Sequence, residues 1–321
     1  MSKIFIAGAG GFIAGHLISS LKKKHELICS DIKPLNQWYQ KFDECENYVF
    51  DLKEAQHCNK LTKDVDYIYN FACNMGGMGF IENNKAECML SVLINTNLLK
   101  AALKNKVKKY FFASSACVYS ATKQINYSSP HLKEEDAYPA EPEDGYGWEK
   151  LFSERMCRHF YEDFGMEVRI ARYHNVYGPH GTWIGGREKA PAALIRKFLE
   201  IKYNKKKNLE IWGDGKQLRS FMYIDDCIKG TNLLFNSAFK DPLNIGVSDF
   251  VSINQLADIL VKISGIDPKR KYILDAPKGV NSRSSDNTLI KSILNWEPSI
   301  LLKDGMKKTY DWIENEFKND L

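Results

Sequence analysis

The chain has 321 residues, of which 44% are hydrophobic and 26% are charged, and its 45 Lys and Arg exceed its 40 Asp and Glu by five. This composition is that of an ordinary globular protein and excludes disordered and collagen-like classes. The basic residues are scattered, so we expect no nucleic-acid partner. No uninterrupted apolar run approaches the ~20 residues of a membrane span, so we expect no membrane contact either.

The first half of the chain alternates short apolar runs with longer amphipathic segments. These patterns predict strands at 3–7, 26–30, 48–52, 66–72, 108–114 and 166–171, and helices at 12–23, 54–63, 83–105 and 146–164. A right-handed crossover places a helix between successive parallel strands. The alternation therefore predicts an α/β fold, a Rossmann-type doubly wound parallel sheet with helices on both faces.

The second half is richer in loops. Gly, Pro and Asn punctuate residues 173–189, 204–220 and 265–287, and helices are expected at 190–203, 225–236, 252–264 and 303–318. We therefore predict a first domain at 1–172 and a smaller α/β domain at 173–321 that caps it. A segment near 221–246, with a strand at 243–245, is expected to return to the first sheet.

Eight cysteines are spread along the chain without a Cys-x-x-Cys pair, and no histidine cluster has metal-ligand spacing. We therefore expect reduced thiols, no metal site and a cytoplasmic location. The apolar start of the chain is interrupted by four glycines between residues 8 and 15, which argues against a targeting segment.

The first predicted strand runs into a glycine-rich turn that opens a helix. The residues of this turn that we expect at a cofactor are Gly8, Gly10, Gly11, Phe12 and Ile13. Glycines let the backbone approach a pyrophosphate, which the free N–H groups of the helix then bind. Asp31 follows the second strand, where a carboxylate binds ribose hydroxyls and repels a 2′-phosphate. The first domain is therefore predicted to bind NAD, with Asp51 and Leu52 on the adenine side.

Tyr146 and Lys150 lie one turn apart on one face of a predicted helix. A lysine ammonium beside a phenol lowers the pKa of the phenol, so Tyr146 is a candidate general base. Ser115 follows the preceding strand, and its hydroxyl is expected to share the reacting oxygen of the substrate.

The glycine-rich turn, the serine and the Tyr-x-x-x-Lys pair, in this order, resemble the extended short-chain dehydrogenase/reductase superfamily of nucleotide-sugar epimerases and dehydratases. The resemblance covers essentially the whole chain. Further segments resemble the GDP-mannose 3′,5′-epimerase family: NMGGMG at 74–79, SSAC at 114–117, PAEP at 139–142, RYHNVYGP at 172–179, GGREKAPA at 185–192, WGDGKQLRSF at 212–221 and RSSDN at 283–287. The resemblance implies an NAD-dependent isomerase that acts on a GDP-sugar.

The implied chemistry is transient oxidation at C4, which acidifies the hydrogens on C3 and C5. The resemblance assigns the acid/base pair that inverts these carbons to Cys117 and Lys189, whose side chains can both be tuned to exchange protons near neutral pH. The expected conversion is GDP-mannose to GDP-L-galactose or GDP-L-gulose. The residues expected at the substrate are Gly76, Gly77, Ser115, Asn175, Lys189, Arg219 and Arg283, the two arginines because guanidinium binds phosphate bidentately.

Other enzymes of the superfamily stay open as alternatives: an NAD-dependent epimerase, a C4 oxidase or a 4,6-dehydratase that acts on a related nucleotide-sugar. A 4,6-dehydratase normally carries an Asp-Glu pair after the serine, where this chain has Ala116 and Cys117, and a 4-epimerase needs no acid/base pair beyond the tyrosine. The chain departs from the epimerase pattern at Ser120-Ala121 and in a Lys-rich loop at 201–209. These changes leave a related sugar, such as a GDP-heptose, as an alternative substrate.

A binder of NAD and nucleotide-sugar without turnover is a different class of function. The five candidate catalytic residues argue against it, because a binder needs none of them. By analogy with extended family members we also expect a homodimer formed through the helices at 83–105 and 146–164, which carry more apolar residues than one buried face needs.

Overall fold

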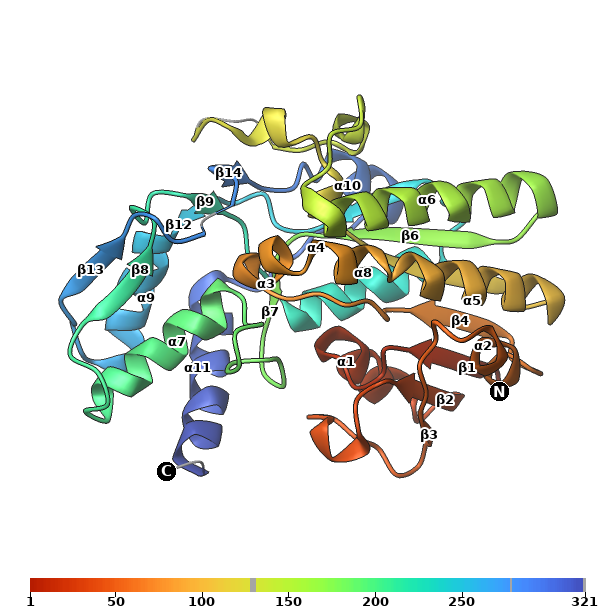
Figure 1. The fold of residues 1–321 in the computed structure, drawn as a ribbon, viewed down its shortest axis with the longest axis horizontal. Coiled ribbons are helices and arrows are strands. Elements are labelled where there is room, and N and C mark those ends of the chain that lie inside the picture. Colours follow the sequence, from red (N-terminus) through yellow and green to blue (C-terminus); the bar gives the residue numbers. More distant parts are fainter. Residues whose placement is uncertain (128–130, 278, 320–321) are drawn as a thin grey trace.

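A computed structural model describes residues 1–127, 131–277 and 279–319, so residues 278, 320 and 321 of the expected second domain lie outside the described residues. Seven parallel strands form the central sheet, in the order β11-β6-β5-β4-β1-β2-β3 (Figure 1). They are β1 (Lys3–Ala7), β2 (Glu26–Asp31), β3 (Glu46–Val49), β4 (Tyr67–Asn70), β5 (Lys109–Ser115), β6 (Val168–Tyr173) and β11 (Pro242–Ile245). The predicted doubly wound sheet is confirmed, and the strand at 243–245 joins it beside β6.

Helices cover both faces of this sheet, because its strands are apolar on both sides. They are α1 (Phe12–Leu21), α2 (Ala55–Leu61), α5 (Val92–Lys104), α6 (Asp144–Phe164) and α8 (Ile224–Asn236). One core cluster joins α1 and α8 to the sheet, and a second joins α2, α5 and α6 to the opposite face.

A buried ion pair ties α6 to the sheet. Arg172 on β6 donates two hydrogen bonds to the carboxylate of Glu154, at 2.9 and 2.7 Å, and both side chains are buried. Ser114 of β5 also donates to Glu154. The helix that carries the Tyr-x-x-x-Lys pair is therefore fixed against two strands by charge-assisted hydrogen bonds.

Two predicted elements are wrong in their bounds. The strand predicted at 48–52 is β3 at Glu46–Val49, and the helix predicted at 83–105 is three helices, α3 (Met78–Asn83), α4 (Lys85–Met89) and α5. Asn84 separates α3 from α4 with non-helical angles of φ −135° and ψ 42°. Its amide bonds to the carbonyl of Phe80, the local competition with helix for which asparagine is known.

The second part of the molecule lies at one side of the sheet and contains small sheets among its helices (Figure 1). Its strands are β7 (Val176–Tyr177), β8 (Leu209–Trp212), β9 (Leu218–Arg219), β10 (Met222–Tyr223), β12 (Val251–Ser252), β13 (Arg270–Ile273) and β14 (Ser282–Arg283). Its helices are α7 (Ala190–Lys202), α9 (Ile253–Ser264), α10 (Thr288–Leu294) and α11 (Leu302–Asn319). Most of these strands fall in segments predicted to be loops, because strands of two to four residues pair only with distant segments.

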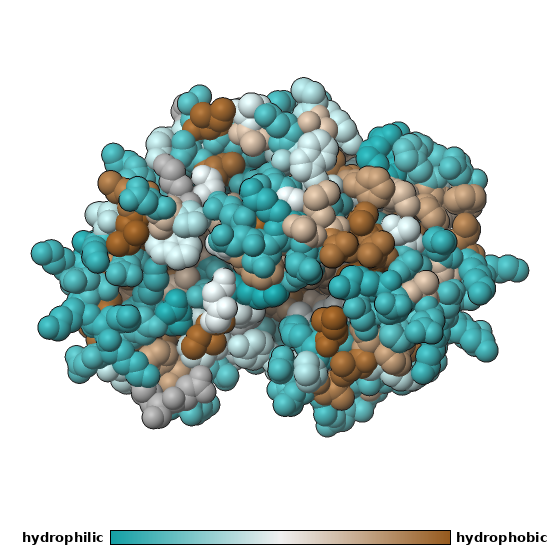
Figure 2. Space-filling model, viewed as in Figure 1, coloured by the Kyte–Doolittle hydropathy of each residue, from teal (hydrophilic) through white to brown (hydrophobic). Residues whose placement is uncertain are grey.

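Short single-turn helices complete the chain: η1 (Leu35–Gln37), η2 (Ala116–Val118), η3 (Ala121–Gln124) and η4 (Glu134–Ala137). The surface is notched between the two parts of the molecule, near α1 on one side and α7 and α11 on the other (Figure 2). Across this notch, the glycine-rich turn that is predicted to bind the nucleotide faces the second part of the molecule.

One stretch of the described residues, Lys85–Lys104, is long and apolar enough to cross a membrane by length and composition alone. The sequence analysis expected no such stretch. Its helices α4 and α5 pack against α6, and α5 also packs against α2. A core helix passes the same test, so this is weak evidence for a membrane span.

Candidate active site

The glycine-rich turn joins β1 to α1 at the carboxyl edge of the sheet. Gly8 has φ +77°, and a Cβ there would lie 2.8 Å from the backbone nitrogen of Ala72. Gly11 precedes α1 in an extended conformation, so the free N–H groups of the first helical turn point toward the turn. Asp31, at the end of β2, accepts a hydrogen bond of 3.0 Å from the N–H of Gly10. Close backbone approach, a helix N-terminus and a ribose-binding carboxylate together fit a dinucleotide such as NAD.

The segment 33–39, which was not singled out from the sequence, covers this turn. The Trp38 ring packs on Gly10 so closely that a Cβ there would lie 2.6 Å from the ring. The indole N–H of Trp38 bonds to the carbonyl of Lys33 at 3.0 Å. The Lys33 ammonium bonds in turn to the carbonyl of Gly10 at 2.6 Å. A cavity of about 410 Å³ lies beside the segment, lined by Lys33, Asn36, Gln37, Trp38, Tyr39 and Thr182.

Asp51 and Leu52 lie just beyond β3, next to the end of β2. The Asp51 carboxylate accepts the N–H of Lys53 at 2.9 Å, and Leu52 is buried in the core. Their expected contact with adenine stays a prediction.

Tyr146, Ser115 and Lys150 come together where β5 meets the start of α6. The Ser115 side chain interacts with the Tyr146 phenol and lowers its pKa, and the Lys150 ammonium lies 5.6 Å from the centre of the tyrosine ring. Lys150 is buried, 3.5 Å from a carboxylate oxygen of the equally buried Glu149. Burial alone would lower the pKa of Lys150, but Cys73 and Glu149 raise it, so the lysine stays charged.

The expected lowering of the tyrosine pKa is not seen in this structure. Burial raises the pKa of Tyr146 well above its ordinary value, and the neighbouring Cys73 and Cys117 act in the same direction. Lys150 is not among the main groups that set the Tyr146 pKa, although its ammonium lies 5.6 Å from the ring centre.

Cys117 lies in η2, immediately beyond β5, and its thiol packs with Tyr146. An Arg283 N–H approaches its sulfur at 3.4 Å, and a second Arg283 nitrogen donates to Glu143 at 2.7 Å. Burial raises the pKa of the Cys117 thiol, Arg283 lowers it and Glu143 raises it again. Glu143 was missed by the sequence analysis, although it lies only three residues before Tyr146.

Lys189 precedes α7 and interacts electrostatically with Cys117 across the site. Lys189 is partly buried, and loss of solvation lowers the pKa of its amine. The loop of Gly76 and Gly77 packs against the loop that carries Lys189, because the N–H of Gly77 bonds to the carbonyl of Arg187 at 3.0 Å. A Cβ at Gly77 would lie 2.5 Å from the carbonyl oxygen of Glu188, so only glycine fits this approach.

Arg219 and Asn175 complete the predicted set. Arg219 lies on β9 and bonds to the carbonyls of Leu218 and Val280 at 2.8 and 2.6 Å. Burial, with the charge of Arg283, lowers the pKa of Arg219 to about 10. Asn175, with φ +39°, bonds to the carbonyl of Ser220 at 3.0 Å. The structure thus gathers Tyr146, Ser115, Cys117, Lys189, Arg219 and Arg283 in one electrostatically connected group.

The sequence profile of the NAD dependent epimerase/dehydratase family matches residues 4–246. The chain therefore belongs to the NAD dependent epimerase/dehydratase family, and it is an enzyme whose cofactor is NAD. Two plant proteins are much more similar to it than the family at large. The GDP-mannose 3,5-epimerase of Arabidopsis thaliana is 44% identical over 99% of this chain and 84% of its own length. GDP-mannose 3,5-epimerase 1 of rice, Oryza sativa subsp. indica, is 45% identical over 99% and 83%. The resemblance drawn from the motifs is confirmed.

Solved structures agree on the fold. The UDP-glucuronic acid 4-epimerase of Bacillus cereus, solved with UDP-glucuronic acid and NAD, has a TM-score of 0.83 at 27% identity and covers 98% of this chain and 99% of its own. A UDP-glucose 4-epimerase from Thermotoga maritima has a TM-score of 0.87 at 22% identity, with the same coverage, and supports the fold alone.

Proposed function

We propose that the protein epimerises GDP-mannose at C3 and C5, to GDP-L-galactose or GDP-L-gulose. The observation that carries the proposal is a surplus of acid/base groups. Tyr146 is enough to move the proton of a C4 hydroxyl, yet a buried thiol and a partly buried amine, Cys117 and Lys189, lie within electrostatic reach of each other beside it. The similarity to plant GDP-mannose 3,5-epimerases supports the same reaction.

The geometry of the site supports the following roles. Tyr146, beside Ser115, takes the proton of the C4 hydroxyl, and the charged Lys150 lies 5.6 Å from the centre of its ring. The glycine-rich turn and Asp31 would hold NAD, which would supply a reversible hydride acceptor for C4 and so give access to a 4-keto state of the sugar. In that state the C–H electron pair of C3 or C5 moves into an enolate as one residue of the Cys117–Lys189 pair removes the proton. The other residue then delivers a proton to the opposite face, which inverts the carbon.

Substrate binding is assigned to groups that surround this pair. Arg219 and Arg283 provide cationic N–H groups for an anionic diphosphate. Asn175 lies beside Arg219, because its amide bonds to the carbonyl of the next residue, Ser220. The backbone of Gly76 and Gly77 lies against the segment that carries Lys189, so we propose that this loop confines the sugar.

The two nearest alternatives predict fewer functional residues. A 4-epimerase would leave Cys117 and Lys189 without a role, and a 4,6-dehydratase would lack its Asp-Glu pair. A GDP-heptose differs from mannose only beyond C5, and the departures at Ser120-Ala121 keep it as the second candidate substrate.

The test is proton NMR of GDP-mannose incubated with the purified enzyme in D2O. Deuterium at C3 and C5 with new galactose- or gulose-configured signals is expected; no exchange by an enzyme that holds NAD would overturn the proposed substrate. Tyr146→Phe is expected to abolish conversion while nucleotide-sugar affinity, measured by calorimetry, stays nearly unchanged. Full turnover in this variant would overturn the mechanism.

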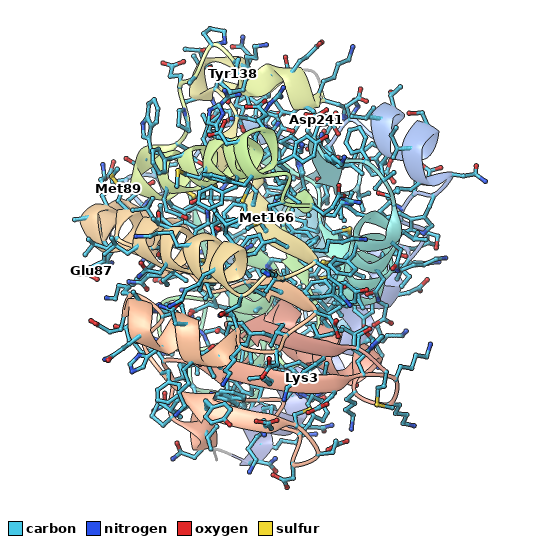
Figure 3. The ribbon with its side chains drawn as sticks, turned by 90° about the vertical axis from the view of Figure 1, so that its right-hand side faces the viewer. Lys3, Glu87, Met89, Tyr138, Met166 and Asp241 are labelled. Carbon is cyan, nitrogen blue, oxygen red and sulfur yellow. The ribbon has the colours of Figure 1, made fainter. Side chains whose placement is uncertain are left out.

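We also infer a cytoplasmic homodimer. All eight cysteines are free thiols, in keeping with a reducing compartment. Large apolar side chains are exposed on α6 and on the α4–α5 segment: Met89, Leu90, Leu93, Trp148 and Phe152. Apolar surface gathers over these helices in Figure 2, and Figure 3 shows Met89 at the outer edge of the molecule. Phe152→Glu is expected to give a monomer in analytical ultracentrifugation; a wild-type monomer would refute the inference.

A further inference from the structure

We propose that Glu143 is a positioning residue that controls, through Arg283, how readily the Cys117 thiol gives up and recovers its proton. The proposal rests on the function proposed above, in which Cys117 exchanges protons with a sugar carbon. None of the motifs that indicated the family assigns a role to Glu143, which lies at the entrance of α6.

The guanidinium of Arg283 links three side chains from separate parts of the chain. It donates to Glu143 at 2.7 Å, to Gln124 at 2.6 Å and to the sulfur of Cys117 at 3.4 Å. Arg283 is 6% exposed, and the side chain of Glu143 is 10% exposed. In such a poorly solvated place the arginine charge acts strongly on the sulfur, and the carboxylate acts strongly against it.

The backbone holds this arrangement in place. The N–H of Glu143 bonds to the carbonyl oxygen of Cys117 at 3.0 Å. One turn into α6, a Cβ on Gly147 would lie 2.3 Å from the same carbonyl, so the start of the helix is seated directly on η2. Glu143 and Cys117 therefore keep their spacing without depending on a mobile side chain.

The charges around the sulfur come from every neighbouring element. Arg283 on β14 and Lys189 before α7 favour the thiolate, and the ionised Glu143 opposes it. The Ser115 hydroxyl accepts a hydrogen bond of 3.2 Å from the Cys117 N–H, while Tyr146 and Arg219 interact with the thiol electrostatically. Burial would raise the pKa of Glu143, but Arg283 holds it below its ordinary value, so Glu143 is ionised at neutral pH.

Arg283 and Glu143 therefore act in opposite directions on the protonation of the Cys117 sulfur. With its carboxylate present, Glu143 pairs with Arg283 at 2.7 Å and offsets its charge, so that the protonated form of Cys117 stays accessible. Without the carboxylate, the arginine charge stands 3.4 Å from the sulfur unopposed and favours the thiolate. A group that must both remove and deliver protons requires both forms near working pH.

The experiment measures the titration of Cys117 in the holoenzyme without substrate. Alkylation by iodoacetamide is followed at Cys117 by peptide mass spectrometry across pH, since only the thiolate displaces iodide. Ultraviolet thiolate absorbance, taken as the difference from a Cys117→Ser variant, gives the same pKa without requiring access for the reagent. Glu143→Gln is expected to lower the pKa of Cys117 by about one to three units, and Arg283→Gln to raise it.

Glu141→Gln is the matched control. This carboxylate is two residues away and bonds to Ser120 instead of Arg283, so the Cys117 titration is expected to stay at the wild-type value. An unchanged or raised Cys117 pKa in Glu143→Gln would overturn the proposal. Should that variant fail to fold, an unchanged pKa in Arg283→Gln would overturn it equally. Because no substrate is present, failure of GDP-mannose turnover in the wild type would be a separate result.

Discussion

Lowering the pH is predicted to destabilise this protein through one buried histidine. His174 follows β6 and is fully buried, with Nε2 bonded to the side-chain oxygen of Asn244 at 2.9 Å. Among the described residues its Nδ1 has no hydrogen-bond partner. Burial lowers the pKa of His174 to about 3, and the nearby charges of Arg283 and Arg172 act in the same direction.

The sign and size follow from linkage. The folded state keeps His174 neutral, while the unfolded chain protonates near pH 6.5. Stability contributed by the neutral imidazole is therefore complete above pH 6.5 and is lost as the pH falls toward 3. With 1.36 kcal/mol per pH unit, the loss is about 2 kcal/mol at pH 5 and about 3 kcal/mol at pH 4.

The assay is urea unfolding at pH 7, 5 and 4 for the wild type and for His174→Gln, whose amide can still donate to Asn244 but cannot titrate. The variant is expected to lose about 3 kcal/mol less between pH 7 and pH 4. Parallel pH profiles for wild type and His174→Gln would refute the reasoning, as would an NMR titration of His174 near pH 6.5 in the folded wild type.

Two further predictions concern the scaffold of the site. Glu154→Gln leaves its arginine partner buried without a counter-charge, so we expect a loss of about 3–5 kcal/mol in urea unfolding, against at most about 1 kcal/mol for Glu162→Gln at an exposed pair. Gly77→Ala forces a Cβ to within 2.5 Å of the Glu188 carbonyl, which should displace the loop that carries Lys189. We therefore expect a large loss of turnover. Gly79→Ala is its control, because the nearest atom is 3.5 Å away; equal activity in both would contradict the role of this contact.

Much of the fold was predictable because it depends on patterns within single segments. Apolar runs of four to seven residues specify strands buried on both faces, and amphipathic spacing specifies the helices between them. The turn at Gly8 and the pair formed by Tyr146 and Lys150 are equally local, so their neighbourhood follows from the strand or helix that carries them. The exceptions were also local: Asn84 interrupts a continuous apolar pattern by bonding to its own helix.

Other features depended on contacts between distant segments, and no local pattern announces those. Arg283 meets Cys117 across 166 residues and Glu143 across 140, so the sequence could propose arginine for a phosphate but not its position at the thiol. Residue spacing likewise predicted a lowered pKa for Tyr146, whereas burial raises it. The sequence by itself determined which chemical groups this protein possesses and the sheet that carries them. Tertiary structure decided which of those groups share a poorly solvated site, and there electrostatic interactions are strong enough to set their protonation.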